Sequence, residues 1–162
     1  MNRLVLIVLY CFSVSFILLA GSRKPQDYTP AQLKSAEDTL LIQNTQILLD
    51  NYLWRDFMPQ SPPDGKPLRA AINIIPLETQ YVPDGIEADK FWILNGDEVW
   101  SGSLETIRPD LPSQNRPKLE KMAQGGPKWG PGIAVTVVVQ IIDAQGNRYL
   151  LKATDQLIHR TD

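Results

Sequence analysis

His159 is the only histidine in the chain and therefore its only imidazole for acid–base chemistry. A nucleophile–histidine–acid arrangement would need it beside Asp155 or Asp162, with a serine as nucleophile. Chain ends fray, His159 lies close to the C-terminus, and the sequence holds no G-x-S-x-G elbow. We therefore expect a surface or strand-end histidine and assign no catalytic residue. A histidine zinc site needs two or three imidazoles, so no metal is expected there.

Acidic residues offer two further kinds of chemistry. Asp84, Glu87 and Asp89 fall in one predicted loop and could give oxygens to calcium. Calcium takes six to eight oxygens, and this spacing matches no known calcium loop, so we expect a solvated acidic turn, no metal and no cofactor.

Two pairs of acidic residues invite comparison with glycoside hydrolases, namely Asp50 with Asp56 and Asp97 with Glu98. That reaction needs two carboxyl groups about 5–9 Å apart across a sugar, which sequence spacing does not establish. Asp97 and Glu98 are explained more simply by a turn. A hydrolase that uses acidic residues or His159 remains the alternative function.

Aromatic and basic residues give the candidates for binding. Trp129, with Lys128 beside it, lies in a Gly-Pro loop, where an aromatic ring can stack on a sugar or anchor a protein, or can plug the end of the fold. Trp54 and Arg55 alternate along a predicted strand. Either they form a polar hot spot of an interface, or Arg55 is partly buried and paired with a neighbouring strand or loop.

Composition narrows the class of protein. The chain has 162 residues and a net charge of −2, with charges of both signs interspersed. Nucleic-acid binding needs a concentrated positive surface, so we expect none. Thirteen prolines and ten glycines favour a loop-rich β protein. Cys11 is the only cysteine, so residues after the leader have no disulfide.

An apolar leader opens the chain. Leu4–Ala20 carries no charge and follows a short basic start, which is typical of a signal peptide or an N-terminal membrane anchor over residues 1–22. Leu18–Ser22 resembles the lipoprotein signal, but Ser22 occupies the position of the lipidated cysteine, so lipidation is not expected. Both alternatives place the domain outside the cytoplasm: periplasmic, secreted or held at the membrane.

The rest of the chain reads as a polar tether at 23–38, with a short helix begun by Thr29-Pro30, and a β domain at 39–162. Alternating apolar residues predict strands around a Gln43-Asn44 turn, at 68–77 and in a long hairpin over 132–158. Asn95-Gly96 predicts a two-residue turn that pairs Leu94 with Asp97. Residues 117–124 have room for two turns of helix.

About seven strands joined mainly by turns predict an all-β, immunoglobulin-like or fibronectin-like antiparallel β-sandwich, with an apolar helix before it. The chain also resembles small bacterial exported proteins with no assigned activity, in the segments 52–59, 126–132 and 155–162. That resemblance implies no catalytic or ligand residues.

Together these features favour an exported or membrane-tethered domain, non-catalytic, that binds a protein or glycan partner or serves as a structural component of the cell envelope. We expect its binding surface at the 59–67 loop and the Trp129 loop, with Trp54 and Arg55 beside them.

Overall fold

The computed structural model describes residues 28–107 and 114–162. The predicted leader at 1–22 and its apolar helix lie outside these residues. Within the described ranges, no helix is long and apolar enough to cross a membrane.

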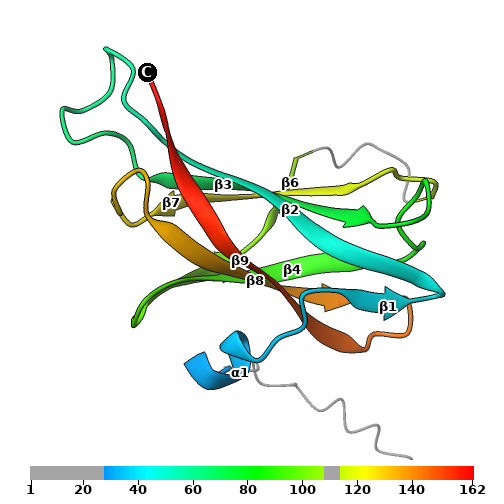
Figure 1. The fold of residues 1–162 in the computed structure, drawn as a ribbon. Coiled ribbons are helices and arrows are strands. Elements are labelled where there is room, and N and C mark those ends of the chain that lie inside the picture. Colours follow the sequence, from blue (N-terminus) through cyan, green and yellow to red (C-terminus); the bar gives the residue numbers. More distant parts are fainter. Residues whose placement is uncertain (1–27, 108–113) are drawn as a thin grey trace, which may run out of the picture.

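The structure is nearly all β (Figure 1). One five-residue helix, α1 (Pro30–Lys34), begins at a Thr29 cap as predicted. The strands that follow are β1 (Leu40–Ile42), β2 (Thr45–Asp56), β3 (Leu68–Pro76), β4 (Glu87–Asn95), β5 (Glu98–Ser103), β6 (Glu105–Thr106), β7 (Leu119–Gly126), β8 (Ala134–Ile142) and β9 (Arg148–Thr161).

The strands form one nearly barrel-shaped sheet in the order β5-β4-β8-β9-β2-β3-β7-β6, and β1 pairs with β2. We call the part from β5 to the first half of β9 sheet A, and the part from the end of β9 to β6 sheet B. The prediction of a purely antiparallel sheet is wrong, because β9 runs parallel to β2, with Leu53 opposite Ile158.

Strand β9 joins the two sheets, and Figure 1 shows it as the long red strand that crosses the molecule. Its first half pairs with β8, and its last residues pair with β2. The change of partner follows a bulge at which the ladder skips from Val135 to Val137, and Asp155 there has a φ of 55°. A bulge with a residue in the left-handed region bends a strand, which lets β9 leave sheet A for sheet B.

The opposite edge is closed by the chain itself. After β5, Leu104 carries the chain across from sheet A, and β6 then pairs with β7 in sheet B. The ring of Trp100 lies over Gly126, where an added Cβ would meet it at 2.7 Å. The crossover and this contact protect the free edges of β5 and β7, which exposed edge strands need.

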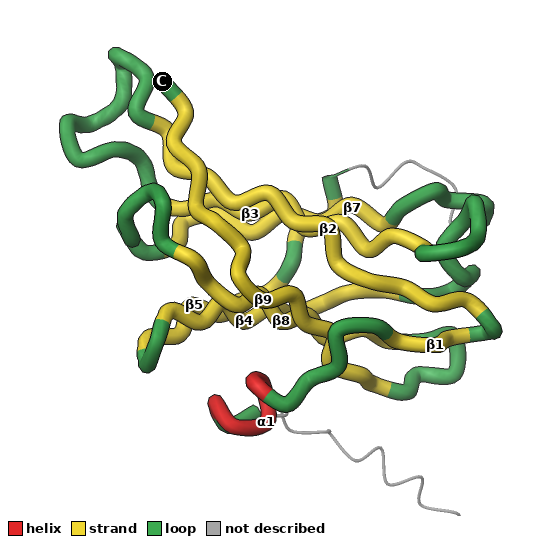
Figure 2. The backbone as a smooth tube through the Cα atoms, viewed as in Figure 1, coloured by secondary structure: helices red, strands yellow, loops and turns green. Residues whose placement is uncertain are grey.

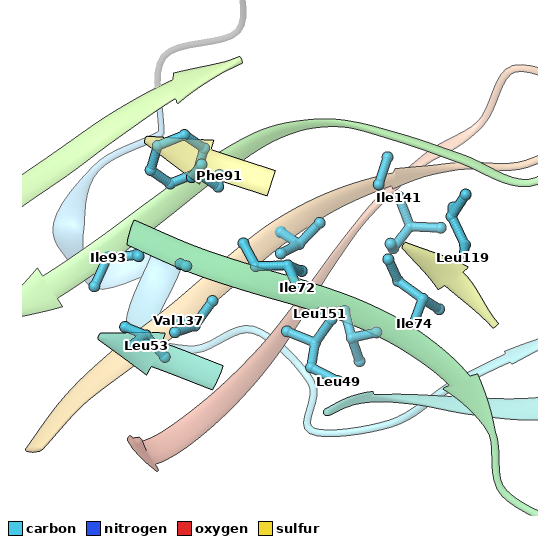
Figure 3. Packing of buried hydrophobic residues seen from close by; sticks show 14 of the residues in the cluster. Leu49, Leu53, Ile72, Ile74, Phe91, Ile93, Leu119, Val137, Ile141 and Leu151 are labelled. Carbon is cyan, nitrogen blue, oxygen red and sulfur yellow. The ribbon is translucent and has the colours of Figure 1, made fainter. Parts of the chain in front are cut away.

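One hydrophobic core fills the space between the two sheets (Figure 3). Strands β2 and β3 bury alternate residues, as the sequence predicts, and Leu53, Ile72 and Ile74 are 0% exposed. They face Val137 and Ile141 of the predicted 132–158 hairpin. Strands β2 and β3 therefore share one core with this hairpin.

Turn residues fix the registers of the hairpins, and the register of the β4–β5 hairpin differs from the predicted one. Gln43 and Asn44 both have positive φ angles, as a two-residue type I′ turn requires. In the β4–β5 hairpin the central residues are Gly96 and Asp97, so Leu94 pairs with Val99 and not with Asp97. Glycine at the first central position suits a type II′ turn, so the turn moves by one residue along the chain and the partner of each β4 residue moves by two.

Residues 117–124 are not helical. Most of them belong to β7, in which Leu119, Lys121 and Ala123 are buried in alternation. Pairing with β3 over most of its length stabilises the strand and overrides the weak helical preference.

The turn between β8 and β9 is organised by Asp143. Its carboxylate accepts hydrogen bonds from the backbone N–H groups of Gln145 and Asn147, from the Asn147 side chain and from the Tyr149 hydroxyl. Burial by itself would raise the pKa of Asp143, but these hydrogen bonds outweigh it and leave the pKa below its ordinary value. The same carboxylate raises the pKa of Tyr149.

Residues 28–38, which we call the strap, lie across the outer face of sheet A (Figure 2). Leu33 and Ala36 pack on Trp92, Leu94 and Val138, which are all buried. The Tyr28 ring meets Trp92 edge to face at 5.3 Å, and Lys152 donates its backbone N–H to Glu37. Both faces of β4 are therefore covered, because Phe91 and Ile93 lie in the main core and Trp92 and Leu94 lie beneath the strap.

Candidate binding surface

Arg55 holds together the two loops in which the sequence predicts binding. Alternation along β2 turns its side chain inward, and it is 4% exposed. Its guanidinium donates to the backbone carbonyls of Lys66 (2.9 Å), Lys128 (3.1 Å) and Trp129 (3.3 Å), and also to that of Asp64. A planar group with five donors suits this task. Arg55 is thus a buried structural clamp, not part of an exposed hot spot.

Two ion pairs reinforce the same loops. Lys128 Nζ lies 2.5 Å from Asp64 Oδ2, and Lys66 Nζ lies 2.7 Å from Asp56 Oδ2. The Lys128 ammonium lowers the pKa of Asp64, and the Lys66 ammonium with the Met58 backbone N–H lowers that of Asp56. Lys128 therefore already has a carboxylate partner within the chain.

Trp129 plugs the end of the core. Its indole is 9% exposed, and its Nε1 donates to Glu98 Oε2 at 2.7 Å. The sequence allowed Trp129 either to contact a partner or to close the end of the fold, and its burial shows the second role. The predicted surface therefore loses its main aromatic residue, and of the four candidates only Trp54 presents an accessible ring.

A different aromatic cluster lies on the outer face of sheet B. Alternation turns Tyr52 and Trp54 of β2 away from the core, and the parallel register places His159 of β9 directly beside Trp54. Tyr52 stacks on Trp54 at 5.5 Å between centroids and on His159 at 4.9 Å. Tyr52 is 45% exposed, and His159 is also exposed. We call these three residues the aromatic cluster.

The neighbouring strands extend this surface. Arg69 of β3 pairs with Trp54, so His159, Trp54 and Arg69 form one row across three strands. The next row runs from Tyr52 through Ala71 to Met122, and all three are at least partly exposed. Tyr52, His159 and Arg69 of these rows are exposed and the other three residues are half-buried, in contrast to Trp92, Leu94 and Val138, which are buried beneath the strap on sheet A.

The composition of this face is typical of protein interfaces. Tyrosine, tryptophan, methionine and arginine are the residues enriched in interface cores and hot spots. Asp50, two rows from Trp54, is exposed and begins a more acidic part of the face. The rings, the methionine and Arg69 therefore form a distinct stripe.

Acid–base catalysis finds little support at His159. Its ring stacks on Tyr52, and the carboxylate of Asp162 accepts from Arg160 at 2.6 Å. Among the described residues, no hydroxyl or carboxylate is hydrogen-bonded to the His159 imidazole. Both the nucleophile and the orienting acid of a triad are missing at this position.

The paired carboxylates are also unsuited to glycoside hydrolysis. Asp50 and Asp56 lie on one extended strand, so six residues separate them by about 20 Å, well beyond the separation that either mechanism uses. Glu98 is bonded to Trp129, and Asp97 lies in the turn.

The acidic segment that could have offered calcium ligands is only partly a loop, since Asp84 lies in an exposed turn as predicted. Glu87 and Asp89 belong to β4, where they meet the side chains of Lys121 and Arg148. In the part of the chain that the structure describes, no three histidine, cysteine or acidic residues are grouped so as to hold a metal ion.

A cavity of about 400 Å³ lies between the strap and the start of β9. Its charged lining includes Arg148, which donates to Gln140 and lies 3.6 Å from Asp89. Gln140 in turn donates to the Tyr28 hydroxyl. These polar interactions within the chain connect Tyr28 of the strap to Gln140 and Arg148 of sheet A.

Sequence reasoning missed Tyr52 and His159 as surface partners. Alternation already placed Tyr52 and Trp54 on one face, so that half of the cluster had a signal in the sequence. His159 had none, because its position depends on a parallel pairing between strands about a hundred residues apart. Comparison with family models, with curated proteins and with solved structures found no match to this chain.

Proposed function

We propose that this chain is a non-catalytic binding domain of the cell envelope, and that it recognises its partner through the aromatic cluster on sheet B. The observation that carries the proposal is the stack of Tyr52, Trp54 and His159, accessible on a sheet face that no described element covers. Exposed aromatic residues beside an arginine and a methionine support recognition, since such side chains gain most from burial at an interface.

Export is the second part of the proposal. The apolar run Leu4–Ala20 after a basic start supports either a cleaved signal or an uncleaved anchor, and both leave the domain outside the cytoplasm. We further propose that the fold is related to immunoglobulin-like sandwiches and to the small bacterial exported proteins that the chain resembles. The long final hairpin and the packing of two sheets on one core support that relation.

Two tyrosines allow a matched test of binding. Tyr52 is 45% exposed and Tyr81 is 46% exposed, but only Tyr52 belongs to the aromatic cluster. The full-length chain and its Tyr52→Ser and Tyr81→Ser variants are used as bait against solubilised cell envelope, and the captured proteins are quantified. We expect the Tyr52→Ser bait alone to lose the partner. Equal capture by all three baits would refute the assignment of the surface.

Location is tested separately by cell fractionation and N-terminal sequencing of the recovered protein. A chain that starts near Arg23, or an intact chain in the membrane fraction, agrees with export. Soluble cytoplasmic protein with an intact leader would overturn it.

A further inference from the structure

The aromatic cluster has a cationic neighbour that is not neutralised by the chain. Arg69 is exposed, lies in the same row as Trp54, and forms no ion pair with any residue in the described ranges. The other cations around the nearby loops do have carboxylate partners, namely Lys66 with Asp56, Lys128 with Asp64, and Arg160 with Asp162. Arg69 is therefore the available positive charge on this face.

Asp56, on the same face of β2 and two residues after Trp54, is paired with Lys66, so the carboxylate that acts on an occupant lies at the other end of the face. Asp50 is exposed on β2, four residues before Trp54, which places the two about 13 Å apart along the strand. An occupant that carries a carboxylate meets attraction at Arg69 and repulsion at Asp50. The face therefore selects both the charge of its occupant and the direction in which it lies.

The geometry of the rings distinguishes between a protein and a glycan. A sugar stacks on a free ring face, and each of the three rings here turns one face towards a neighbour, with angles between planes of 29° and 13°, so less ring face is left for a sugar. Ala71 and Met122 lie in the same row as Tyr52 and add aliphatic side chains to the rings. Aromatic and aliphatic side chains beside an arginine suit packing against the side chains of a protein.

Building on the proposed function, we propose that the partner is a protein segment in which an acidic side chain lies next to an apolar or aromatic one. The acidic side chain pairs with Arg69, and the apolar one packs on Tyr52 and Trp54. An arginine binds a carboxylate through two parallel hydrogen bonds, so this pairing fixes the register of the segment as well as adding affinity.

The test uses the full-length chain in detergent micelles and a library of random twelve-residue peptides displayed on phage. We expect the enriched peptides to carry aspartate or glutamate within two positions of an apolar or aromatic residue. For a synthetic peptide of enriched sequence, Arg69→Gln should raise the Kd about threefold to tenfold. Replacing the carboxylate of the peptide by its amide should have the same effect, and the two changes together should add little more.

Three controls accompany the measurement. Arg69→Lys keeps the charge and should retain part of the affinity, whereas Lys34→Gln, on the strap of the opposite face, should leave it unchanged. Tyr52→Ser should weaken every enriched peptide. Thermal unfolding of each variant verifies that the fold is intact.

The outcomes separate the two proposals. The proposal of an acidic segment is overturned if the enriched peptides are neutral, or if Arg69→Gln leaves the Kd unchanged while Tyr52→Ser raises it. Either result leaves the assignment of the surface in place. Peptides that bind equally to the wild type and to Tyr52→Ser overturn both proposals. Binding to immobilised glycans, with no peptide enriched, overturns the protein partner.

Discussion

At the scale of single residues, the most consequential side chain is Arg55. A guanidinium buried inside a protein is costly unless its donors are satisfied, and here four carbonyls from two loops accept from it. The Cζ atom of Arg55 lies 5.0 Å from the centroid of the Phe57 ring, and the guanidinium of Arg160 stacks on the same ring. The loops at this end are therefore shaped by one residue of β2.

Replacing Arg55 by alanine should lower the free energy of unfolding by about 3 kcal/mol, because four carbonyls, of which that of Trp129 is buried, lose their donor together. Arg69→Ala is the matched control, since Arg69 is an exposed arginine on the neighbouring strand and its loss should change stability by less than about 0.5 kcal/mol. Urea unfolding measures both. An equally small effect for the two variants would show that the clamp contributes nothing.

Acidification should destabilise the protein through Asp143, together with Asp56 and Asp64. Each has a pKa below its ordinary value of 3.8 in the folded state, so each stabilises the fold above that pH and loses its contribution as the pH falls through the folded pKa. The wild type should lose stability below about pH 4, and Asp143→Asn should lose less. The check is urea unfolding at several pH values. If the free energy of unfolding falls by the same amount with pH in the two proteins, Asp143 does not contribute to the loss of stability in acid.

At the scale of elements, the closure between β5 and β7 depends on a residue without a side chain. Gly126 ends β7 beneath the Trp100 ring, and an added methyl group would meet ring carbons at 2.7 Å. An aromatic ring packed against the core cannot retreat cheaply, because Trp100 also meets Phe91 at 4.8 Å.

Gly126→Ala should therefore destabilise the fold by about 1–3 kcal/mol through overpacking. Gly130→Ala provides the control, because its nearest neighbour would be the Ile133 side chain at an ordinary 3.7 Å. Thermal unfolding compares the two. The account of the closure fails if Gly130→Ala is the more harmful change.

Elements with strict alternation were predictable from sequence, and those that depend on distant pairing were not. Strands β2 and β3 follow their alternating apolar residues, because burial of every second side chain decides them, whereas β8 is recognised by its run of valine and isoleucine residues, which is buried on both faces. Strand β7 was missed because its strand character comes from β3. The β4–β5 register was missed because one glycine selects between two turn types. The clamp role of Arg55 was among the alternatives, but its carbonyl partners are far away in sequence.

At the scale of the whole molecule, the two outer faces differ. Sheet A carries Trp92, Leu94 and Val138, and the strap buries all of them. Sheet B carries the aromatic cluster, Ala71 and Met122, and the described residues leave them accessible. Apolar side chains that persist on one face, while the chain covers those of the other, are what a recognition surface requires.

Photo-crosslinking inside intact cells tests the central claim, that the aromatic face of sheet B is where this protein meets its partner. A benzophenone amino acid is introduced in place of the half-buried Ala71, beside Tyr52 and Met122, and in a second chain in place of the exposed Tyr81. We predict a discrete crosslinked protein from position 71, abolished by an added Tyr52→Ser, and none from position 81. Crosslinks from position 81 with none from position 71 would contradict the account.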